Sequence, residues 1–232
     1  MLASFAYFII LSTTGDISMK ENKQKAILIG AGEMGTCIPE VSEKDFVIAL
    51  DGGLLVCEKC GIVPGMIVGD FDSLPEEKKE CLHQYPEEIL YRLPREKDDT
   101  DTLAAIKLAI GRGFREFVIY GGLGGRLSHT IANIQCLMYL KERSINGVLV
   151  GKDTKAFLLR NETCILDEKE SGYVSIFSYS PRAEGISLKN LKYELEDACL
   201  TDSFPLGISN EFVGKSAEIT VKEGTLLLVF DK

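Results

Sequence analysis

The segment GMIVGDFDS, residues 65–73, joins a short apolar run directly to two carboxylates one residue apart. Short runs rich in Val and Ile and bounded by glycine are typical of buried strands. Asp70 and Asp72 therefore follow the carboxyl end of a predicted strand, which is the edge where open parallel sheets bind ligands. A turn with aspartates at favoured positions is the structural alternative.

Similar apolar runs and two amphipathic stretches surround this segment. Thr102–Ile110 and Ser128–Arg143 have helical periodicity, and Thr100 or Asp101 is a candidate cap for the first. Alternating strands and helices predict an α/β domain, residues 19–155, with a largely parallel sheet and helices on both faces. The other predicted strands are AILIG (26–30), DFVIAL (45–50), EFVIYG (116–121) and GVLVG (147–151).

The pattern changes after about residue 159, where short apolar or alternating pieces are separated by Gly, Pro and Asn. This pattern predicts an all-β domain over residues 156–232. The stretch AEITV-KEG-TLLLVF has the pattern of two strands around a short turn. A domain of this size has a marginal core, so we expect it to pack on the first domain or on a partner chain.

The beginning of the chain differs from the rest. Residues 2–11 are apolar but too short to span a bilayer, and no Lys or Arg precedes them as in a signal peptide. Met19 opens a more ordinary beginning. We therefore predict that residues 1–18 are a disordered tail or an extension from a wrongly assigned start, and that the protein is not a membrane protein.

Composition limits the class of protein. The 232 residues are 45% hydrophobic and 26% charged, as in globular proteins, and the net charge of −9 argues against nucleic-acid binding. Of the seven cysteines, Cys57 and Cys60 form a Cys-x-x-Cys pair, but no second pair has zinc-ligand spacing. Reduced thiols in a cytoplasmic protein are the favoured interpretation.

A second acidic cluster, KDDTD at residues 97–101, follows about 25 residues later. Asp98 and Asp101 share a face if a helix begins there, whereas Asp99 points elsewhere. Such runs are often solvated loops or caps. However, carboxylates that converge repel each other by about 1 kcal/mol per pair at 4 Å in water, and a bound metal commonly compensates this. Mg²⁺ prefers one or two carboxylates with water and phosphate oxygens, so two acidic clusters favour a magnesium-bound polyphosphate.

The glycine-rich run GGLGGR, residues 121–126, follows a predicted strand and leads into a predicted helix. Glycines let the backbone approach a ligand, and a helix N-terminus favours an anion. Arg126 adds a bidentate donor. These features predict phosphate binding, although the glycines alone also suit a turn. His129 is a candidate for nucleotide contact or for capping the helix.

A different glycine run, GAGEMG at residues 30–35, matches the dinucleotide fingerprint G-x-G-x-x-G, and Asp51 ends the next predicted strand. The fingerprint requires a helix that starts at the loop. Pro39 and the strand at 45–50 leave little room for one, so a nicotinamide or flavin site is disfavoured. We expect these glycines to shape a tight loop over a ligand or a simple turn.

Together these pieces resemble the thiamine pyrophosphokinase (thiamine diphosphokinase) family over residues 25–232. The shared segments are DGG (51–53), GDFDS (69–73), KDxTD (97–101), GGRxSH (124–129), GISLKNLKY (185–193) and GISNE (207–211). The resemblance implies an α/β catalytic domain, a thiamine-binding C-terminal β-sandwich and a homodimer with thiamine near the subunit interface. The implied transferase reaction moves a pyrophosphoryl group from ATP to the thiamine hydroxyl and releases AMP.

The resemblance also implies roles for individual residues. Catalytic and Mg²⁺-binding roles fall on Asp70, Asp72, Asp98 and Asp101. ATP-binding roles fall on Asp51, Thr100, Gly122, Gly124, Gly125, Arg126, Ser128 and His129. Thiamine contacts fall on Ser209 and Asn210, for which a polar β-turn is the alternative. The family often has Asp at the position of Ser128, and the chain has no Trp, so ring stacking on thiamine requires Tyr or Phe.

Two rival functions remain open at this stage. A phosphatase of the D-x-D-x type would use Asp70 as a covalent nucleophile, but it leaves the glycine and arginine loop unexplained. A non-catalytic nucleotide- or thiamine-binding module would not need so many carboxylates. In the favoured mechanism, the thiamine hydroxyl attacks the β-phosphorus in line with the departing AMP, and positioning and electrostatics supply most of the catalysis.

Overall fold

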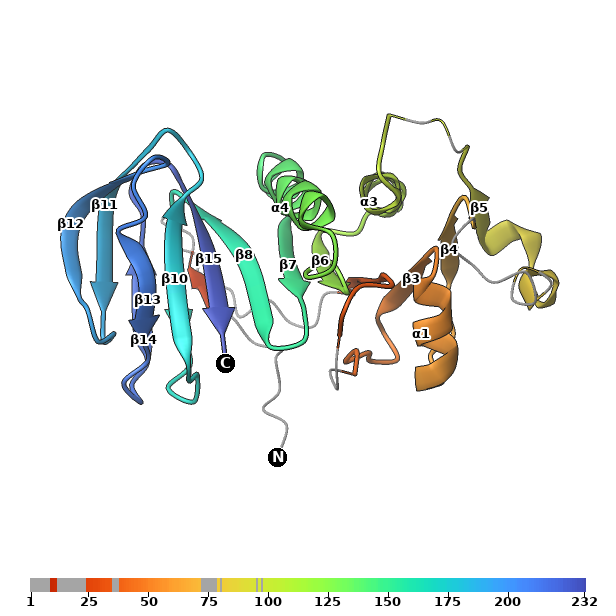
Figure 1. Ribbon diagram of the computed structural model, residues 1–232, viewed down its shortest axis with the longest axis horizontal. Helices are drawn as coiled ribbons and strands as arrows, with labels where there is room; N and C mark the ends of the chain where they lie inside the picture. The colour runs from red at the N-terminus through yellow and green to blue at the C-terminus, as the bar shows by residue number, and fades with distance from the viewer. Residues whose placement is uncertain are drawn as a thin grey trace. The chain divides into compact units, whose positions relative to one another are not determined.

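The computed structural model describes residues 9–11, 24–34, 38–71, 79, 81–94, 96 and 98–232. The chain forms two compact units (Figure 1). One comprises residues 22–155, and the other comprises residues 156–232 together with residues 1–21. Each unit is described by itself below.

The described part of unit 22–155 contains a parallel sheet with the strand order β7-β6-β2-β3-β4-β5. The strands are β2 (Ala26–Ile29), β3 (Phe46–Leu50), β4 (Met66–Gly69), β5 (Leu90–Arg92), β6 (Glu116–Tyr120) and β7 (Asn146–Val150). Ala26 pairs in register with Phe46 of β3 and with Phe117 of β6. The chain therefore runs outward from β2 to β5 and then returns to the other side of β2. This reversal of direction makes the β2–β6 junction the topological switch point of the sheet.

Helices cover the two faces of this sheet. They are α1 (Gly53–Cys60), α3 (Asp101–Gly111) and α4 (Leu127–Lys141), with the short 3-10 helices η1 (Cys81–Gln84) and η2 (Glu87–Ile89) before β5. In Figure 1, α1 lies on one side of the strands, and α3 and α4 lie on the other. Strands β2 and β4 are fully buried between these layers, which explains their uninterrupted apolar sequences. The predicted α/β architecture is confirmed.

Helix α1 was not predicted from the sequence. Its eight residues, GLLVCEKC, begin with glycine and contain a continuous apolar run instead of a spaced apolar stripe. Leu54 and Cys57 of α1 pack in one core cluster with Ile29 of β2. Contact with the sheet therefore stabilises a helix whose own sequence has little helical periodicity.

The described part of the C-terminal unit is all β, as predicted. Its strands are β8 (Thr154–Arg160), β9 (Thr163–Leu166), β10 (Tyr173–Ser178), β11 (Arg182–Lys189), β12 (Leu195–Thr201), β13 (Gly207–Glu211), β14 (Ala217–Thr220) and β15 (Thr225–Asp231). One group has the order β13-β10-β15-β8, and the other has the order β9-β14-β11-β12. Strand β10 of the first contacts β12 of the second. Strands β14 and β15 flank a short turn, yet each pairs in a different group.

Part of the N-terminal segment 1–18 is described. Ile9–Leu11 form β1, which pairs antiparallel with β9 through Ile9 and Ile165. The rest of this segment lies outside the described residues, so its predicted disorder stays a prediction. Among the described helices, none has both the length and the apolar character needed to cross a membrane.

Candidate functional site

Several candidate segments of unit 22–155 directly follow the carboxyl ends of parallel strands. Asp51 follows β3, Asp70 follows β4, and Gly121 follows β6. Since parallel strands end at one edge of the sheet, the fold places these segments at the same edge. Asp72 lies outside the described residues, so its predicted position beside Asp70 is untested.

The two glycine loops meet at the switch point. The amide of Gly30 donates to the Tyr120 carbonyl over 2.9 Å, and a Cβ atom at Gly32 would lie 2.1 Å from the Gly121 carbonyl oxygen. Only glycine permits this approach. No helix begins in residues 30–34 or 38–45, the described parts of the β2–β3 connection. Residues 30–34 of this run therefore form one wall of a loop pair, and no helix of a dinucleotide fingerprint begins in this described part.

The loop after β6 leaves backbone donors without a protein acceptor among the described residues. Gly121, Gly124 and Gly125 have φ of 68°, 81° and 63°, a left-handed conformation that favours glycine. The carbonyls are engaged, since Asn133 donates to Gly122 over 2.8 Å and Thr130 donates to Gly124 over 3.3 Å. Within the described structure, the amides of residues 122–126 donate to no protein group. This arrangement suits an anion.

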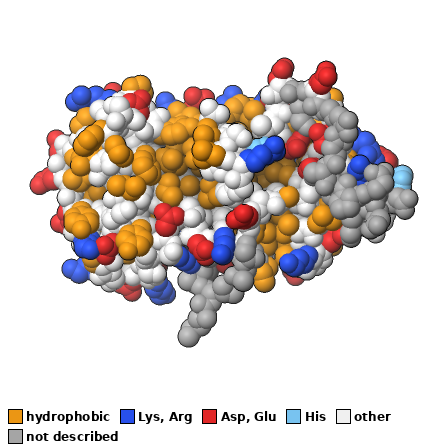
Figure 2. All heavy atoms as spheres, viewed as in Figure 1, with side chains coloured by type: hydrophobic (Ala, Val, Ile, Leu, Met, Phe, Trp, Pro, Cys, Tyr) orange, Lys and Arg blue, Asp and Glu red, His pale blue; other side chains and the backbone are white. Residues whose placement is uncertain are grey.

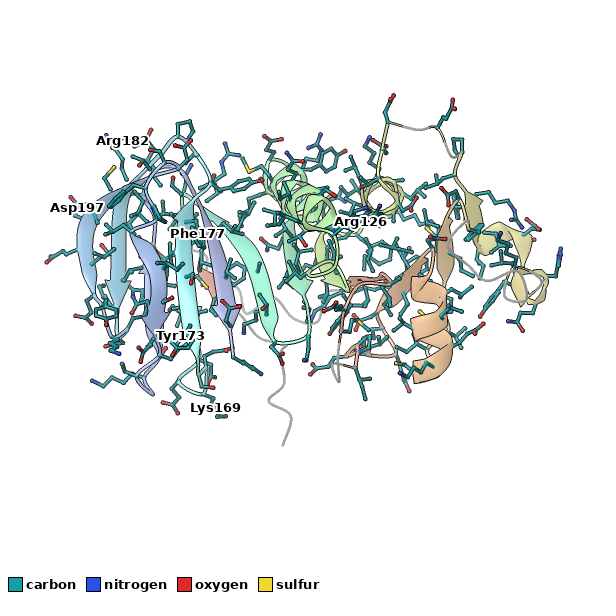
Figure 3. All side chains as sticks on the ribbon, in the orientation of Figure 1. Arg126, Lys169, Tyr173, Phe177, Arg182 and Asp197 are labelled. Atoms are coloured by element: carbon teal, nitrogen blue, oxygen red, sulfur yellow. The ribbon has the colours of Figure 1, made fainter. Side chains whose placement is uncertain are left out.

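The N-terminus of α4 directly follows the loop of residues 122–126. Arg126, labelled in Figure 3, is the N-cap residue of α4, and its side chain makes no capping hydrogen bond to the described residues. His129 also makes no capping hydrogen bond in the described structure, which settles one of its two sequence-based alternatives. Arg126, Ser128 and His129 are all exposed in the first turn or just before it. The free helix end and the guanidinium both favour a negatively charged ligand.

Left-handed backbone conformations occur at Asp51 and at Phe71, the residue that follows Asp70. Asp51 has φ of 46°, and its amide donates to the Val68 carbonyl over 2.9 Å. A Cβ atom at Gly69 would lie 3.1 Å from the Asp51 Cα, so Asp51 lies against the end of β4, next to Asp70. Phe71, with φ of 61°, is buried beyond Asp70 and anchors that turn in the core. The structure thus brings Asp51 and Asp70 together.

The described residues of the acidic cluster before α3, positions 98–101, have different environments. Thr100 is the N-cap of α3, and its hydroxyl accepts from the Leu103 amide over 3.2 Å. Asp99 pairs with Lys107, with an Oδ2–Nζ distance of 2.7 Å, and the hydrogen bond raises the pKa of Lys107. Asp98 is exposed, and Asp101 occupies the first turn of the helix. Asp99 is therefore occupied by a surface ion pair.

The described side chains do not by themselves form a complete metal cage. Within the described part of the chain, no three His, Cys, Asp or Glu side chains gather closely enough to hold a metal ion. The sequence predicted that Asp70, Asp98 and Asp101 converge. In the described structure these three carboxylates do not form a three-ligand cluster. Mg²⁺ commonly takes only one or two protein carboxylates, with water and phosphate oxygens as its other ligands.

Ser209 and Asn210 lie on β13 but differ in environment. Ser209 is exposed with φ of 57°, whereas Asn210 is buried. The Asn210 Oδ1 accepts from the amides of Tyr193 and Glu211, both over 2.9 Å, and its Nδ2 donates to the Tyr193 carbonyl over 2.7 Å. Asn210 therefore fixes the backbone of Tyr193, whose side chain is 59% exposed. Sequence reasoning missed Tyr193, although the absence of Trp pointed to Tyr or Phe.

The family models match both parts of the chain. "Thiamin pyrophosphokinase, catalytic domain" matches residues 39–149, and "Thiamin pyrophosphokinase, vitamin B1 binding domain" matches residues 162–226. A thiamine pyrophosphokinase of Bacillus subtilis is 28% identical over 210 residues, which are 88% of this chain and 98% of that protein.

Solved structures share the fold. A crystal structure of thiamine pyrophosphokinase from Bacillus subtilis has a TM-score of 0.81 at 24% identity and covers 90% of this chain and 99% of its own. The enzyme from Geobacillus thermodenitrificans gives 0.78 at 25%, with coverage of 90% and 98%. Yeast thiamin pyrophosphokinase gives 0.73 at 15%, with coverage of 92% and 88%.

Proposed function

The chain belongs to the thiamine pyrophosphokinase family, and we propose that it acts as a thiamine diphosphokinase. In this reaction the thiamine hydroxyl oxygen bonds to the β-phosphorus of ATP. The bond between that phosphorus and the oxygen retained by AMP breaks. The products are thiamine diphosphate and AMP. The phosphatase and the non-catalytic module are not favoured by the comparisons.

The observation that carries the ATP proposal is the loop of residues 122–126. Its amides have no acceptor within the described structure, and the uncapped start of α4 follows directly. Free amides and a helix end, placed at the topological switch point of a parallel sheet, are suited to phosphate oxygens. Arg126 adds a planar donor that stabilises negative charge as AMP departs. Ser128 and His129 lie at the same helix end, where they would contact the nucleotide.

The acidic residues fit a magnesium ion that is held mainly by phosphate and water. Asp70 follows β4 beside Asp51, and Asp98 and Asp101 bracket the start of α3. Carboxylate oxygens are suitable Mg²⁺ ligands, and Mg²⁺ does not require a cage made by protein alone. When bound, the ion would neutralise triphosphate charge. We propose Asp70, Asp72, Asp98 and Asp101 as its direct or water-mediated ligands.

The thiamine site is proposed on the exposed side of β13. Ser209 presents a hydroxyl to solvent, and Tyr193 presents a ring whose backbone is fixed by Asn210. An exposed aromatic ring on a fixed backbone is suited to stacking on a flat cationic heterocycle. We therefore assign Ser209 a direct polar contact and Tyr193 a stacking contact. Asn210 acts in this proposal by holding Tyr193 in place.

A homodimer is proposed from the apolar surface of the C-terminal unit. Figure 2 shows hydrophobic side chains gathered over this unit, and Tyr173 is labelled on β10 in Figure 3. Strand β13 ends its group of strands, and Ile208 on it is 57% exposed. An exposed strand edge beside apolar side chains is a typical site for a second copy. The other exposed large apolar residues described in the C-terminal unit are Tyr173, Tyr193, Phe204, Leu206 and Val213.

We also propose that the enzyme works in the cytoplasm. The described cysteines at positions 57, 60, 136, 164 and 199 are all free thiols. Reduced thiols are usual in that compartment.

The test is to incubate the purified protein with thiamine and Mg-ATP and to follow the nucleotides and thiamine diphosphate by chromatography. We expect AMP and thiamine diphosphate in equal amounts, and EDTA should abolish both. Formation of ADP would contradict pyrophosphoryl transfer. Phosphate release without a need for thiamine would support the phosphatase, and binding without any turnover would support the non-catalytic module.

A further inference from the structure

Glu33, from the glycine run after β2, lies against the loop of residues 122–126. A Cβ atom at Gly124 would lie 3.5 Å from the Glu33 Cβ and 3.8 Å from its Oε2. The Glu33 side chain is exposed, and within the described structure it makes no hydrogen bond or ion pair. An unengaged carboxylate thus stands beside the proposed phosphate loop.

This position is unfavourable for a direct phosphate contact. Two unit charges of the same sign repel by about 1 kcal/mol at 4 Å in water, and by more where water is excluded. Glu33 therefore needs a neighbour that donates a hydrogen bond or carries positive charge. A nucleotide offers hydroxyl donors on its ribose, one ester bond away from the α-phosphate.

The sheet order separates Glu33 from the acids proposed for the metal. Glu33 follows β2, and Asp70 follows β4, with β3 between them. Neighbouring strands are about 4.8 Å apart, so these two strands are about 10 Å apart. A Mg–O bond is only about 2 Å long. Glu33 is thus better placed beside the loop after β6 than in a metal site centred on Asp70.

We propose that Glu33 determines nucleotide specificity by accepting hydrogen bonds from the ribose hydroxyls of the bound nucleotide. A carboxylate accepts from hydroxyl groups through two oxygens, and acidic residues recognise ribose in this way in other open α/β sheets. The inference rests on the proposed function, because it assumes that the phosphates of ATP bind at residues 122–126. It gives a role to the run GAGEMG, which the dinucleotide interpretation left without one.

The experiment compares the binding of ATP, 2′-deoxy-ATP and 3′-deoxy-ATP by equilibrium dialysis with Mg²⁺ and without thiamine. In the unsubstituted protein, at least one deoxy analogue should bind about tenfold more weakly than ATP, since a hydrogen bond to a charged group is lost. In Glu33→Ala, the three nucleotides should bind within about threefold of one another. Glu33→Gln, which keeps one acceptor, should give an intermediate preference.

Glu43→Gln is the matched control, because Glu43 is an exposed glutamate in the same β2–β3 connection. It should keep the preference of the unsubstituted protein. The inference is overturned if Glu33→Ala weakens all three nucleotides equally, if the preference is unchanged, or if the main effect is a higher requirement for Mg²⁺. It is also overturned if the unsubstituted protein shows no ribose preference.

The same proteins are then assayed for AMP formation with thiamine. Ribose preference that depends on Glu33, without AMP formation, would support the Glu33 inference and contradict the proposed function. If AMP is formed but Glu33→Ala leaves the ribose preference unchanged, the result would support the proposed function and contradict the Glu33 inference. The two failures are therefore distinguishable.

Discussion

The two units offer polar groups for recognition in different ways. In unit 22–155, Asn133 and Thr130 engage carbonyls of the loop after β6, whereas the amides of residues 122–126 donate to no described protein group. In the C-terminal unit, Asn210 is only 4% exposed and uses its side-chain amide on the backbone of Tyr193 and Glu211. The first unit thus presents backbone donors directly, whereas the second uses a buried polar group to fix an exposed ring.

This difference teaches that a shared motif residue need not touch a ligand. Arg126 is exposed at the end of the glycine loop, so its substitution should act mainly on binding. A buried, fully engaged amide acts first on the fold, because its loss leaves neighbouring groups without partners. Substitutions at Arg126 and at Asn210 should therefore separate into effects on turnover and effects on stability.

The largest effect is expected for Asp70→Asn. Loss of the carboxylate charge should lower kcat/KM about 10²- to 10³-fold, the usual cost of removing one preorganised electrostatic group. Asp99→Asn is the control, because Asp99 pairs with Lys107 at the surface, and it should change kcat/KM by less than about threefold. Equal losses in the two variants, measured by AMP formation, would refute the separate role of Asp70.

A smaller effect is expected for Arg126→Ala, which should raise the KM for ATP about 10- to 100-fold and leave the KM for thiamine within about twofold. Arg126→Lys should recover part of the loss, because lysine keeps the charge but not the bidentate geometry. Arg115→Ala is the control, since Arg115 precedes β6 at the opposite end of the strand. A rise confined to the thiamine KM would contradict the assignment.

In the C-terminal unit, Asn210→Ala and Ser209→Ala should have different effects on stability and on thiamine binding. Asn210→Ala leaves the amides of Tyr193 and Glu211 without an acceptor, so the free energy of unfolding should fall by about 2–4 kcal/mol in denaturant titrations. Ser209→Ala removes an exposed hydroxyl and should change stability by less than about 0.5 kcal/mol. It should raise the thiamine KM severalfold. Equal losses of stability in the two variants would contradict the different roles assigned to Asn210 and Ser209.

The smallest effect concerns thiol labelling in the folded protein. Burial raises the pKa of Cys57 to about 12 and that of Cys136 to about 11, so both thiols stay protonated at pH 8. Cys199 of the C-terminal unit is exposed. Iodoacetamide should label Cys199 before Cys57 and Cys136, and peptide mass spectrometry should find Cys57 and Cys136 modified only after unfolding. Early labelling of Cys57 would contradict its burial.

The sequence by itself determined the α/β architecture, the all-β C-terminal domain and the family. Continuous apolar strands such as residues 66–69 are predictable because burial on both faces requires them. The segment KDDTD predicted a helix cap at Thr100 or Asp101, and Thr100 is the N-cap. Such a cap is predictable because it acts through its own neighbours in the chain.

Only the tertiary structure decided features that depend on contacts between distant segments. The exclusion of a side chain at Gly32 comes from Gly121, and the engagement of Asn210 comes from Tyr193. Helix α1 forms because Leu54 and Cys57 pack on the sheet, although its sequence lacks a helical stripe. The position of Glu33 beside Gly124 likewise follows from the strand order, which places β2 next to β6. Local patterns specify elements, whereas the neighbours of each element are fixed by packing and by hydrogen bonds that close over long stretches of chain.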